Sequence, residues 1–269
     1  MALFHTTLRE KILYKQVIKV IAGLYNFDLN HIIRLIKAAE LAGASYIDIA
    51  ASPEIVTIIR SITNFPICVS SIDPIALYEC KIAGADILEI GNFDIFYKKG
   101  IFFSKSQIKN LVKETQRLVK ENDLCVTIPH ILSLNNQIDL SISLQDLGVH
   151  MLQTEGISTK NYINQVTKLS IISSIYKASA SLSSTYAIAK SVSLPIISSS
   201  GMSALSAPFA IYYGASGIGI CSALNSFKTV SEIYIYLNEI VSSLFFLQNY
   251  CNKYEPLIIN SIKLSQIRA

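Results

Sequence analysis

Short runs of apolar, mostly β-branched residues alternate along the chain with longer segments in which apolar residues recur every three or four positions, as at Ile32, Ile33 and Ile36. The short runs are typical of strands buried on both faces, and the longer segments are typical of amphipathic helices. This alternation predicts eight strands joined by helices. The predicted strands are Val17–Ala22, Tyr46–Ala50, Ile67–Ser71, Ile87–Gly91, Leu124–Ile128, Met151–Glu155, Pro195–Ser199 and Gly217–Cys221.

Helix start and stop signals fall between these strands. Ser52 and Asp73 each precede a proline, so each is expected to cap a helix that begins at that proline. A glycine stands shortly before every second strand, where the end of a helix needs a left-handed residue. These glycines are Gly43, Gly84, Gly148 and Gly214. A two-unit pattern repeated around a ring is typical of the quarters of a barrel.

Eight βα units in about 200 residues, with right-handed crossovers between parallel strands, predict a single (β/α)8 TIM barrel. The barrel domain is expected to occupy residues 1–269, with a core from about 16 to about 249 and a C-terminal extension from about 250 to 269. An open doubly wound sheet is the alternative. Such a sheet is expected to carry a glycine-rich phosphate loop after its first strand, and Ala22-Gly23-Leu24 is poor in glycine.

The connection after the sixth strand is the longest. About 25 residues, Gly156–Leu182, separate that strand from the next predicted helix, and a connection of this length is usually functional or mobile. Because it leaves the catalytic face of a barrel, one interpretation is a lid. The other is a surface insertion with a short extra helix around Ser170–Tyr176.

The composition excludes several classes of protein. With 51% hydrophobic and 16% charged residues, the chain is not disordered. No apolar run is long enough to span a membrane, and the N-terminus lacks a signal-peptide core. The five cysteines form no C-x-x-C pair, which indicates a reducing compartment. The mean hydropathy of +0.42 therefore indicates a soluble fold whose strands are buried on both faces.

The net charge of +4 is spread along the chain without a block of like charges. It favours a small anionic ligand and does not indicate nucleic-acid binding. No membrane partner is expected, and a homo-oligomer is left open. The four histidines and five cysteines show no metal-ligand spacing, so no metal site is expected.

Polar residues lie on or just after most predicted strands, where a TIM barrel holds its ligand. They are Lys19, Asp48, Ser70, Ser71, Glu89, Asn92, Asp94, His130, Gln153, Glu155 and Ser198–Ser200. Four of them are expected to face the barrel interior, where a charge is costly unless it is paired or used. These four are Lys19, Asp48, Glu89 and Glu155. One lysine facing several carboxylates favours catalysis, as a general acid and base or as a Schiff-base nucleophile, and a structural ion-pair network is the alternative.

A second set of residues surrounds the ends of the seventh and eighth strands, where barrels of this kind bind phosphate. The set is Ser200, Gly201, Ser203, Gly219, Cys221 and Ser222. Glycines let backbone N–H groups approach an anion closely, and helix starts favour negative charge. These residues therefore predict a phosphate site, with two ordinary glycine turns as the alternative. His130, which follows Pro129 after the fifth strand, is a candidate proton shuttle.

Several phrases of the sequence resemble one known family. They include Lys19-Val20-Ile21-Ala22-Gly23-Leu24, Leu88-Glu89-Ile90-Gly91-Asn92-Phe93-Asp94, Val126-Thr127-Ile128-Pro129-His130 and Ser200-Gly201-Met202-Ser203. From about residue 16 to about residue 240, the chain resembles the hypothetical chloroplast open reading frame 23 proteins of red-algal plastids and cyanobacteria. The resemblance implies a single barrel and a plastid location, which we expect to be the stroma, and it implies no established activity. In that family a glycine usually stands where this chain has Cys221, whose side chain leaves less room for a phosphate.

Three functions fit these residues. The first is an isomerase or lyase acting on a small phosphorylated metabolite, in which Lys19, Glu89 and Glu155 transfer protons while Asp48 tunes Lys19. The second is an oxidoreductase that holds the cofactor flavin mononucleotide (FMN) by the same phosphate site. The third is a non-catalytic metabolite-sensing or assembly protein, which the side chain of Cys221 favours.

Overall fold

The computed structural model describes residues 5–23, 25–91, 93–97, 99–120, 122–156 and 170–245. Within them, eight parallel strands close in chain order into one barrel. The strands are β1 (Val17–Gly23), β2 (Tyr46–Ala50), β3 (Ile67–Ser71), β4 (Ile87–Ile90), β5 (Asp123–Ile128), β6 (Met151–Thr154), β7 (Ile196–Ser199) and β8 (Gly217–Ile220). The predicted TIM barrel is confirmed, the open sheet is excluded, and each strand end lies within one residue of its prediction.

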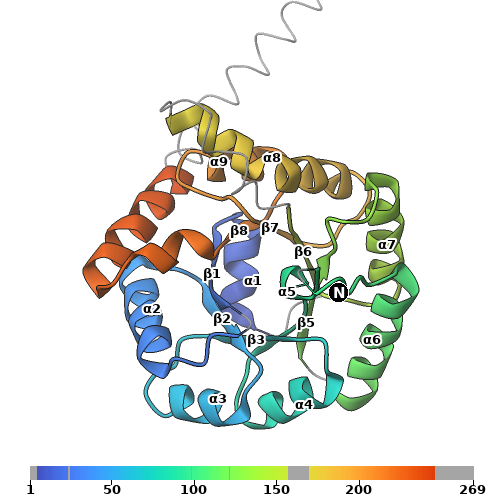
Figure 1. Cartoon of the computed structure of the whole chain (residues 1–269), viewed down its shortest axis with the longest axis horizontal. Coiled ribbons are helices and arrows are strands. Elements are labelled where there is room, and N and C mark those ends of the chain that lie inside the picture. The colour runs from blue at the N-terminus through green and yellow to red at the C-terminus, as the bar shows by residue number, and fades with distance from the viewer. Residues whose placement is uncertain are drawn as a thin grey trace, which may run out of the picture.

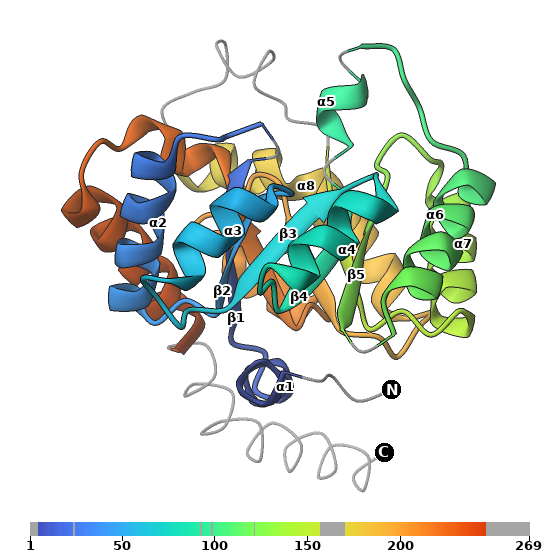
Figure 2. The same cartoon turned by 90° about the horizontal axis from the view of Figure 1, so that it is seen from below.

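Helices surround the barrel, as Figure 1 shows. The outer helices are α2 (Leu29–Ala42), α3 (Pro53–Arg60), α4 (Pro74–Ile82), α6 (Lys105–Leu118), α7 (Leu134–Asp146), α8 (Ser170–Ala189), α9 (Ala207–Tyr212) and a last helix over 230–245. Two helices lie at the ends of the barrel instead. α1 (Thr6–Leu13) lies beneath the N-terminal ends of the strands, and α5 (Asp94–Tyr97) lies above their C-terminal ends (Figure 2). None of the helices described here is both long and apolar enough to cross a membrane.

The helix signals in the sequence act as predicted. At the starts of α3 and α4, Ser52 and Asp73 accept hydrogen bonds from the backbone N–H groups of Ile55 and Ile75, at 3.4 and 2.9 Å. Gly43 ends α2 with a φ of 73°, a left-handed conformation that strains any residue with a side chain. The serine and aspartate caps fix where α3 and α4 begin, and Gly43 ends α2 close to β2.

The segment after β6 differs from the prediction. α8 runs over 20 residues, so the short extra helix expected around 170–176 is the first part of one long helix, and the predicted connection of about 25 residues is wrong. The buried face of α8 carries Ala178, Ser181, Leu182, Thr185 and Ile188 at helical spacing. Because two of these residues are polar, the apolar periodicity is hidden in the sequence. The predicted lid over 157–169 and the predicted C-terminal extension lie outside the described residues.

The inside of the barrel is built in layers. The lower layer is apolar apart from one phenol, and its members are Val17, Tyr46, Cys68, Ile87, Cys125, Met151 and Ile197, with Leu8 of α1 packed against them. Two residues further along each of the strands β1 to β7, the same inward-facing positions carry polar side chains. These are Lys19, Asp48, Ser70, Glu89, Thr127, Gln153 and Ser199, and all of them are buried. The barrel therefore has an apolar floor with a polar layer above it.

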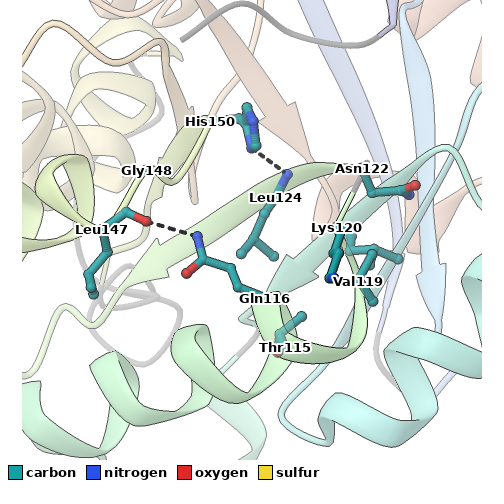
Figure 3. A pocket seen from close by; sticks show the side chains of 10 residues that line it. Thr115, Gln116, Val119, Lys120, Asn122, Leu124, Leu147, Gly148 and His150 are labelled. Atoms are coloured by element: carbon teal, nitrogen blue, oxygen red, sulfur yellow. Dashed lines mark hydrogen bonds between the residues drawn. The ribbon is translucent and has the colours of Figure 1, made fainter.

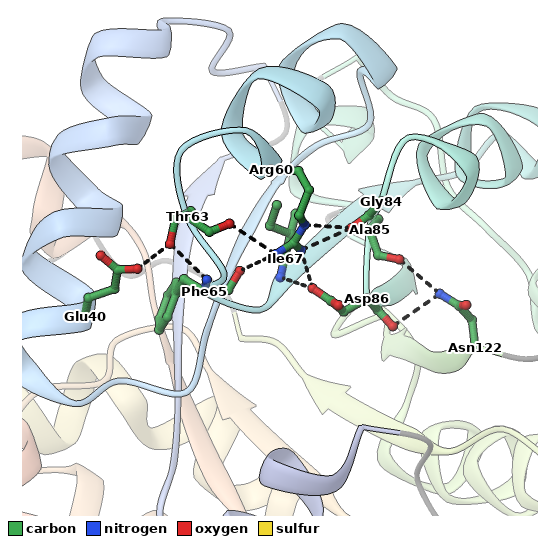
Figure 4. Close-up of polar contacts among 9 residues, drawn as sticks. All are labelled: Glu40, Arg60, Thr63, Phe65, Ile67, Gly84, Ala85, Asp86 and Asn122. Atoms are coloured by element: carbon green, nitrogen blue, oxygen red, sulfur yellow. Dashed lines mark hydrogen bonds and ion pairs between the residues drawn. The ribbon is translucent and has the colours of Figure 1, made fainter.

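Arg60, at the end of α3, ties together the turns that precede β3 and β4 (Figure 4). Its guanidinium donates to the carbonyl oxygen of Gly84 at 3.1 Å and pairs with Asp86 Oδ2 at 2.5 Å. The same Asp86 oxygen accepts the N–H of Ile67 at 2.8 Å. These contacts lie at the N-terminal ends of the strands, which serve stability in a TIM barrel, whereas the ligand is held at the other end.

Candidate active site

Lys19 lies in the polar layer inside the barrel and contacts three side chains. Its Nζ lies 2.5 Å from Glu89 Oε2 and 2.9 Å from Asp48 Oδ2. The same ammonium donates to Gln153 Oε1 at 2.9 Å. The side chains of Lys19 and Glu89 are 0% exposed, and that of Asp48 is 1% exposed. The structure therefore brings together three of the four charged residues singled out from the sequence, far from bulk water.

Further hydrogen bonds orient the two carboxyl groups. Ser70 Oγ donates to Asp48 Oδ1 at 2.6 Å. Thr127 Oγ1 and Gln153 Nε2 each donate to Glu89 Oε1 at 2.9 Å. Because a buried network whose members are all hydrogen-bonded is held in one arrangement, the charged groups of this cluster have fixed positions.

The cluster holds one ammonium and two carboxyl groups. Burial lowers the pKa of Lys19, but the attraction of Asp48 and Glu89 outweighs burial and raises that pKa well above its ordinary value. Burial also raises the pKa of Asp48, by more than the neighbouring Lys19 lowers it. Lys19 is therefore held as a cation, which does not fit the Schiff-base role, because that role needs a neutral amine.

Glu155 does not join this cluster. It follows β6 and lies two residues beyond Gln153, so it is one step nearer the mouth of the barrel, and Gln153 faces Lys19 in its place. Glu155 Oε1 accepts hydrogen bonds from the Tyr97 hydroxyl at 2.7 Å and from the His130 N–H at 3.1 Å, and it lies 3.0 Å from His130 Nδ1. The five candidate catalytic residues thus form two groups, one inside the barrel and one at its mouth.

The turn after β7 carries half of the predicted phosphate site. Ser200 and Gly201 both have left-handed φ angles, 78° and 73°. A Cβ atom on Gly201 would lie 2.2 Å from the carbonyl oxygen of Lys177, so the close approach of α8 requires glycine there. The N–H of Ser203 donates to Ser206 Oγ at 2.9 Å. This turn is therefore shaped by its own packing and hydrogen bonds.

The other half of the predicted phosphate site lies on and after β8. Gly219 is inside the strand, where a Cβ atom would lie 2.8 Å from Ser199 Oγ. Cys221 comes just before the short helix η3 (Ser222–Ser226), and Ser222 is exposed. β7 and β8 are paired, so the two turns lie at neighbouring strand ends. Gly219 lies below the turns, beside Ser199 of the polar layer.

Four residues of the two groups are not among the candidate catalytic residues chosen from the sequence, namely Ser70, Thr127, Gln153 and Tyr97. Ser70 and Gln153 stand only in the wider list of polar residues at the strand ends. Gln153 lies two residues before Glu155 and therefore faces the same side of the strand. Because it is uncharged, it does not stand out in the sequence as Glu155 does. Tyr97 gives no signal in the sequence, because only the position of α5 over the mouth brings it to Glu155.

A cavity of about 220 Å³ lies outside the barrel wall, between α6, α7 and the beginnings of β5 and β6 (Figure 3). On its walls, Gln116 Nε2 donates to the carbonyl oxygen of Leu147 at 2.9 Å, and the N–H of Leu124 donates to His150 Nδ1 at 3.2 Å. Leu124 and His150 lie near the N-terminal ends of their strands. The cavity is therefore at the opposite end of the barrel from the candidate site.

Metal-binding and thiol chemistry gain no support from the geometry. Within the part of the chain that the structure describes, no three His, Cys, Asp or Glu side chains are grouped to hold a metal ion. Burial raises the pKa of the Cys68 and Cys125 thiols well above their ordinary value. Both residues are therefore neutral thiols of the barrel core rather than nucleophiles.

The fold and the interior define a TIM barrel whose ionisable side chains meet inside the strand ring. Residues 4–250 match the family described as "Protein of unknown function (DUF561)", and the chain belongs to this family. The uncharacterized protein ycf23 of Antithamnion sp. is 45% identical over 249 residues, which cover 90% of each chain. That of Pyropia yezoensis is 46% identical over 231 residues, 86% of this chain and 83% of that protein. The resemblance to the chloroplast open reading frame 23 family is confirmed, and these plastid-encoded algal relatives indicate a plastid location.

Solved structures with this fold share little sequence with the chain. Thiamine phosphate pyrophosphorylase from Pyrococcus furiosus is 15% identical with a TM-score of 0.57, over 87% of this chain and 98% of that chain. (S)-3-O-geranylgeranylglyceryl phosphate synthase from Thermoplasma acidophilum, solved with its substrate sn-glycerol-1-phosphate, is 14% identical with a TM-score of 0.56, over 90% of this chain and 99% of that chain. At these identities the likeness shows the fold alone.

Proposed function

We propose that this chain is an isomerase or lyase that acts on a small phosphorylated metabolite in the plastid stroma. The observation that carries the proposal is the contact of the buried Lys19 ammonium with Glu89 and Asp48 inside the barrel. A buried ion pair stabilises a fold little or not at all compared with apolar residues of similar volume, and the layer beneath is almost wholly apolar. A charged cluster beneath the C-terminal ends of TIM-barrel strands is the arrangement expected of an acid–base site.

Gly91 leaves room for the side chains that orient Glu89. It follows β4, and a Cβ atom there would lie 2.9 Å from Glu89 Oε1 and 2.2 Å from Thr127 Oγ1. A side chain at this position would collide with the network that orients Glu89. Glycine at this position therefore keeps the hydrogen bonds of Glu89 intact.

In the proposed reaction, the buried groups act on the carbonyl end of the substrate. Glu89 takes a proton from the carbon beside the carbonyl group, and the Lys19 ammonium stabilises the negative charge that develops on the oxygen. Asp48 adjusts the charge balance around Lys19. The phosphate group is held by the turns at the ends of β7 and β8, through Ser200, Gly201, Ser203, Gly219, Cys221 and Ser222. Glu155 and His130 contact the substrate at the mouth of the barrel.

Two further observations support a phosphorylated substrate. The names of both solved structures contain a phosphorylated compound, which is an analogy at the level of the fold. The net charge of +4 favours an anionic ligand.

Ligand-induced stabilisation tests the phosphate site. We expect inorganic phosphate and sn-glycerol-1-phosphate to raise the thermal unfolding midpoint and glycerol to leave it unchanged, because only a ligand of the native state stabilises it. Ser222→Asp places a negative charge at the proposed site and should abolish the increase. Ser226→Asp is the matched control, since Ser226 is an exposed serine of the same helix η3, and it should keep the increase. Equal increases in both variants would contradict the phosphate site.

Proton transfer is tested in D2O with dihydroxyacetone phosphate, which carries a carbonyl group, as the probe. Deuterium should enter the probe at the carbon beside its carbonyl group. Glu89→Gln should slow this exchange by about 100-fold or more, the usual contribution of a general base. Binding of the probe without exchange, by the wild type, would overturn the enzymatic proposal and favour the sensing function.

A further inference from the structure

Glu155, His130 and Tyr97 form a second polar group at the mouth of the barrel. We propose that His130 is a proton-transfer residue whose basic nitrogen is Nε2, and that Glu155 and Tyr97 are positioning residues for its imidazole. This inference deepens the proposed function and rests on it for the identity of the substrate. The contacts within the group do not depend on the proposed function.

Three contacts converge on one oxygen of Glu155. The hydroxyl of Tyr97 and the main-chain N–H of His130 donate to Oε1 at 2.7 and 3.1 Å, and His130 Nδ1 lies 3.0 Å from the same atom. An ionised carboxylate accepts hydrogen bonds and donates none, so Nδ1 carries the hydrogen in the third contact. In a neutral imidazole the lone pair that takes up a proton is then on Nε2.

Tyr97 holds the imidazole from a second side. Its ring packs edge-on against the His130 ring, with 5.0 Å between the centroids and 85° between the planes. Tyr97 is held in turn by Phe102, which stacks on it at 5.9 Å, and by Phe93 at 6.5 Å. The side chains of His130 and Glu155 are 12% and 6% exposed. An imidazole fixed through its ring, its Nδ1 atom and its own backbone has the preorganisation that a general base requires.

This mouth group lies on the same three strands as one side of the Lys19 cluster. β4, β5 and β6 are neighbours in the barrel. They supply Glu89, Thr127 and Gln153 inside the barrel, and the segments that follow them supply Tyr97, His130 and Glu155. A substrate that reaches Glu89 from the mouth therefore passes His130. Isomerisation removes one proton and delivers another, and a carboxylate below with an imidazole above provides one group for each step.

A purely structural latch would use some of the same contacts. Tyr97 and Glu155 would hold α5 over the mouth, and the imidazole would only fill space. The tautomer of His130 tests whether Glu155 and Tyr97 position the imidazole, and it can be measured without a substrate. Proton transfer by His130 separates the catalytic role from a latch, because a latch does not need it.

The first experiment records two-bond ¹⁵N–¹H correlation spectra of protein labelled at its four histidines. His130→Asn identifies the His130 signals. At a pH where the ring is neutral, we expect the wild-type hydrogen on Nδ1. Glu155→Ala removes the acceptor and Tyr97→Ala removes the supporting ring, so both should give a mixture of tautomers. Tyr212→Ala, at an 80% exposed tyrosine, is the matched control and should change nothing. A wild-type hydrogen on Nε2, or a tautomer unchanged in both variants, would overturn the positioning role.

The second experiment follows dihydroxyacetone phosphate in D2O and measures both deuterium uptake and conversion of the probe to its isomeric aldehyde. Because Glu89 removes the carbon-bound proton and His130 serves the other proton transfer, His130→Asn should slow conversion by about 100-fold or more while the Kd of the probe changes less than about threefold. Conversion lost in Glu89→Gln but kept in His130→Asn would overturn the inference and leave the proposed function standing. A wild type that neither binds nor exchanges the probe would end the proposed function, and the proton-transfer role of His130 with it, whatever the tautomer.

Discussion

Lys19 on β1 and Glu89 on β4 are 70 residues apart in the chain, yet Lys19 Nζ and Glu89 Oε2 lie 2.5 Å apart inside the barrel. The closed order of the strands makes this contact possible, because inward-facing residues of strands that are not neighbours meet across the barrel. Asp48 Oδ2 lies 2.9 Å from the same ammonium, so the three residues form a charged centre in the protein interior.

Lys19→Met should lower the free energy of unfolding by about 3–5 kcal/mol, because it leaves two buried carboxyl groups without their cation. Urea unfolding followed by circular dichroism measures the change. Adding Asp48→Asn should restore part of the loss, since the variant amide can still bond to Ser70 and one negative charge is removed. A Lys19→Met protein as stable as the wild type would show that the carboxylates do not depend on Lys19.

Tyr46→Phe should leave the free energy of unfolding unchanged or raise it by up to about 1 kcal/mol. The Tyr46 hydroxyl is buried and has no hydrogen-bond partner among the residues that the structure describes. A buried polar group without a partner costs about 1–3 kcal/mol, and phenylalanine keeps the ring while removing that group. Chemical unfolding of the two proteins compares them. A clear loss of stability in the variant would show that the hydroxyl makes a bond in solution.

Gly201→Ala should destabilise the protein by more than Gly43→Ala. Both glycines have a φ of 73°, so both alanine variants carry the same backbone strain, about 1–2 kcal/mol. At Gly43 the added Cβ meets no atom within 4 Å, whereas at Gly201 it would lie 2.2 Å from the carbonyl oxygen of Lys177. Thermal and urea unfolding of the pair isolate the effect of packing. Equal losses would mean that α8 moves away from the β7 turn without cost.

The stability of the protein should fall as the pH drops from about 7 to about 5, partly because of His150. Burial lowers the pKa of His150 in the native state. The unfolded chain therefore takes up the proton at higher pH than the native state does, and the free energy of unfolding decreases as the pH falls through the unfolded pKa. His150→Asn keeps an acceptor for the N–H of Leu124 but does not titrate in this range. Its unfolding free energy should depend less on pH than that of the wild type, and parallel pH profiles would refute the assignment.

The strands were predictable because each is a short apolar run bounded by glycine, proline or a helix cap, and both faces of a strand in this barrel are buried. Lys19, Asp48 and Glu89 could also be predicted, because a charged residue within an apolar run is easily recognised in the sequence. The start of α8 was not visible, because Ser181 and Thr185 occupy buried positions and bond to side chains of β6 and β7. The contact of Tyr97 with Glu155 depends on the position of α5 over the mouth of the barrel, which no periodicity within one segment encodes.

Native mass spectrometry of the protein purified gently from its source, followed by denaturing release of bound small molecules, tests the central claim most directly. The proposed function predicts a co-purifying phosphorylated compound that is released on denaturation and that a Ser222→Asp protein, expressed in the same way as its wild-type counterpart, does not retain. A mass equal to that of the bare chain in every oligomeric state would contradict a phosphate site at the ends of β7 and β8.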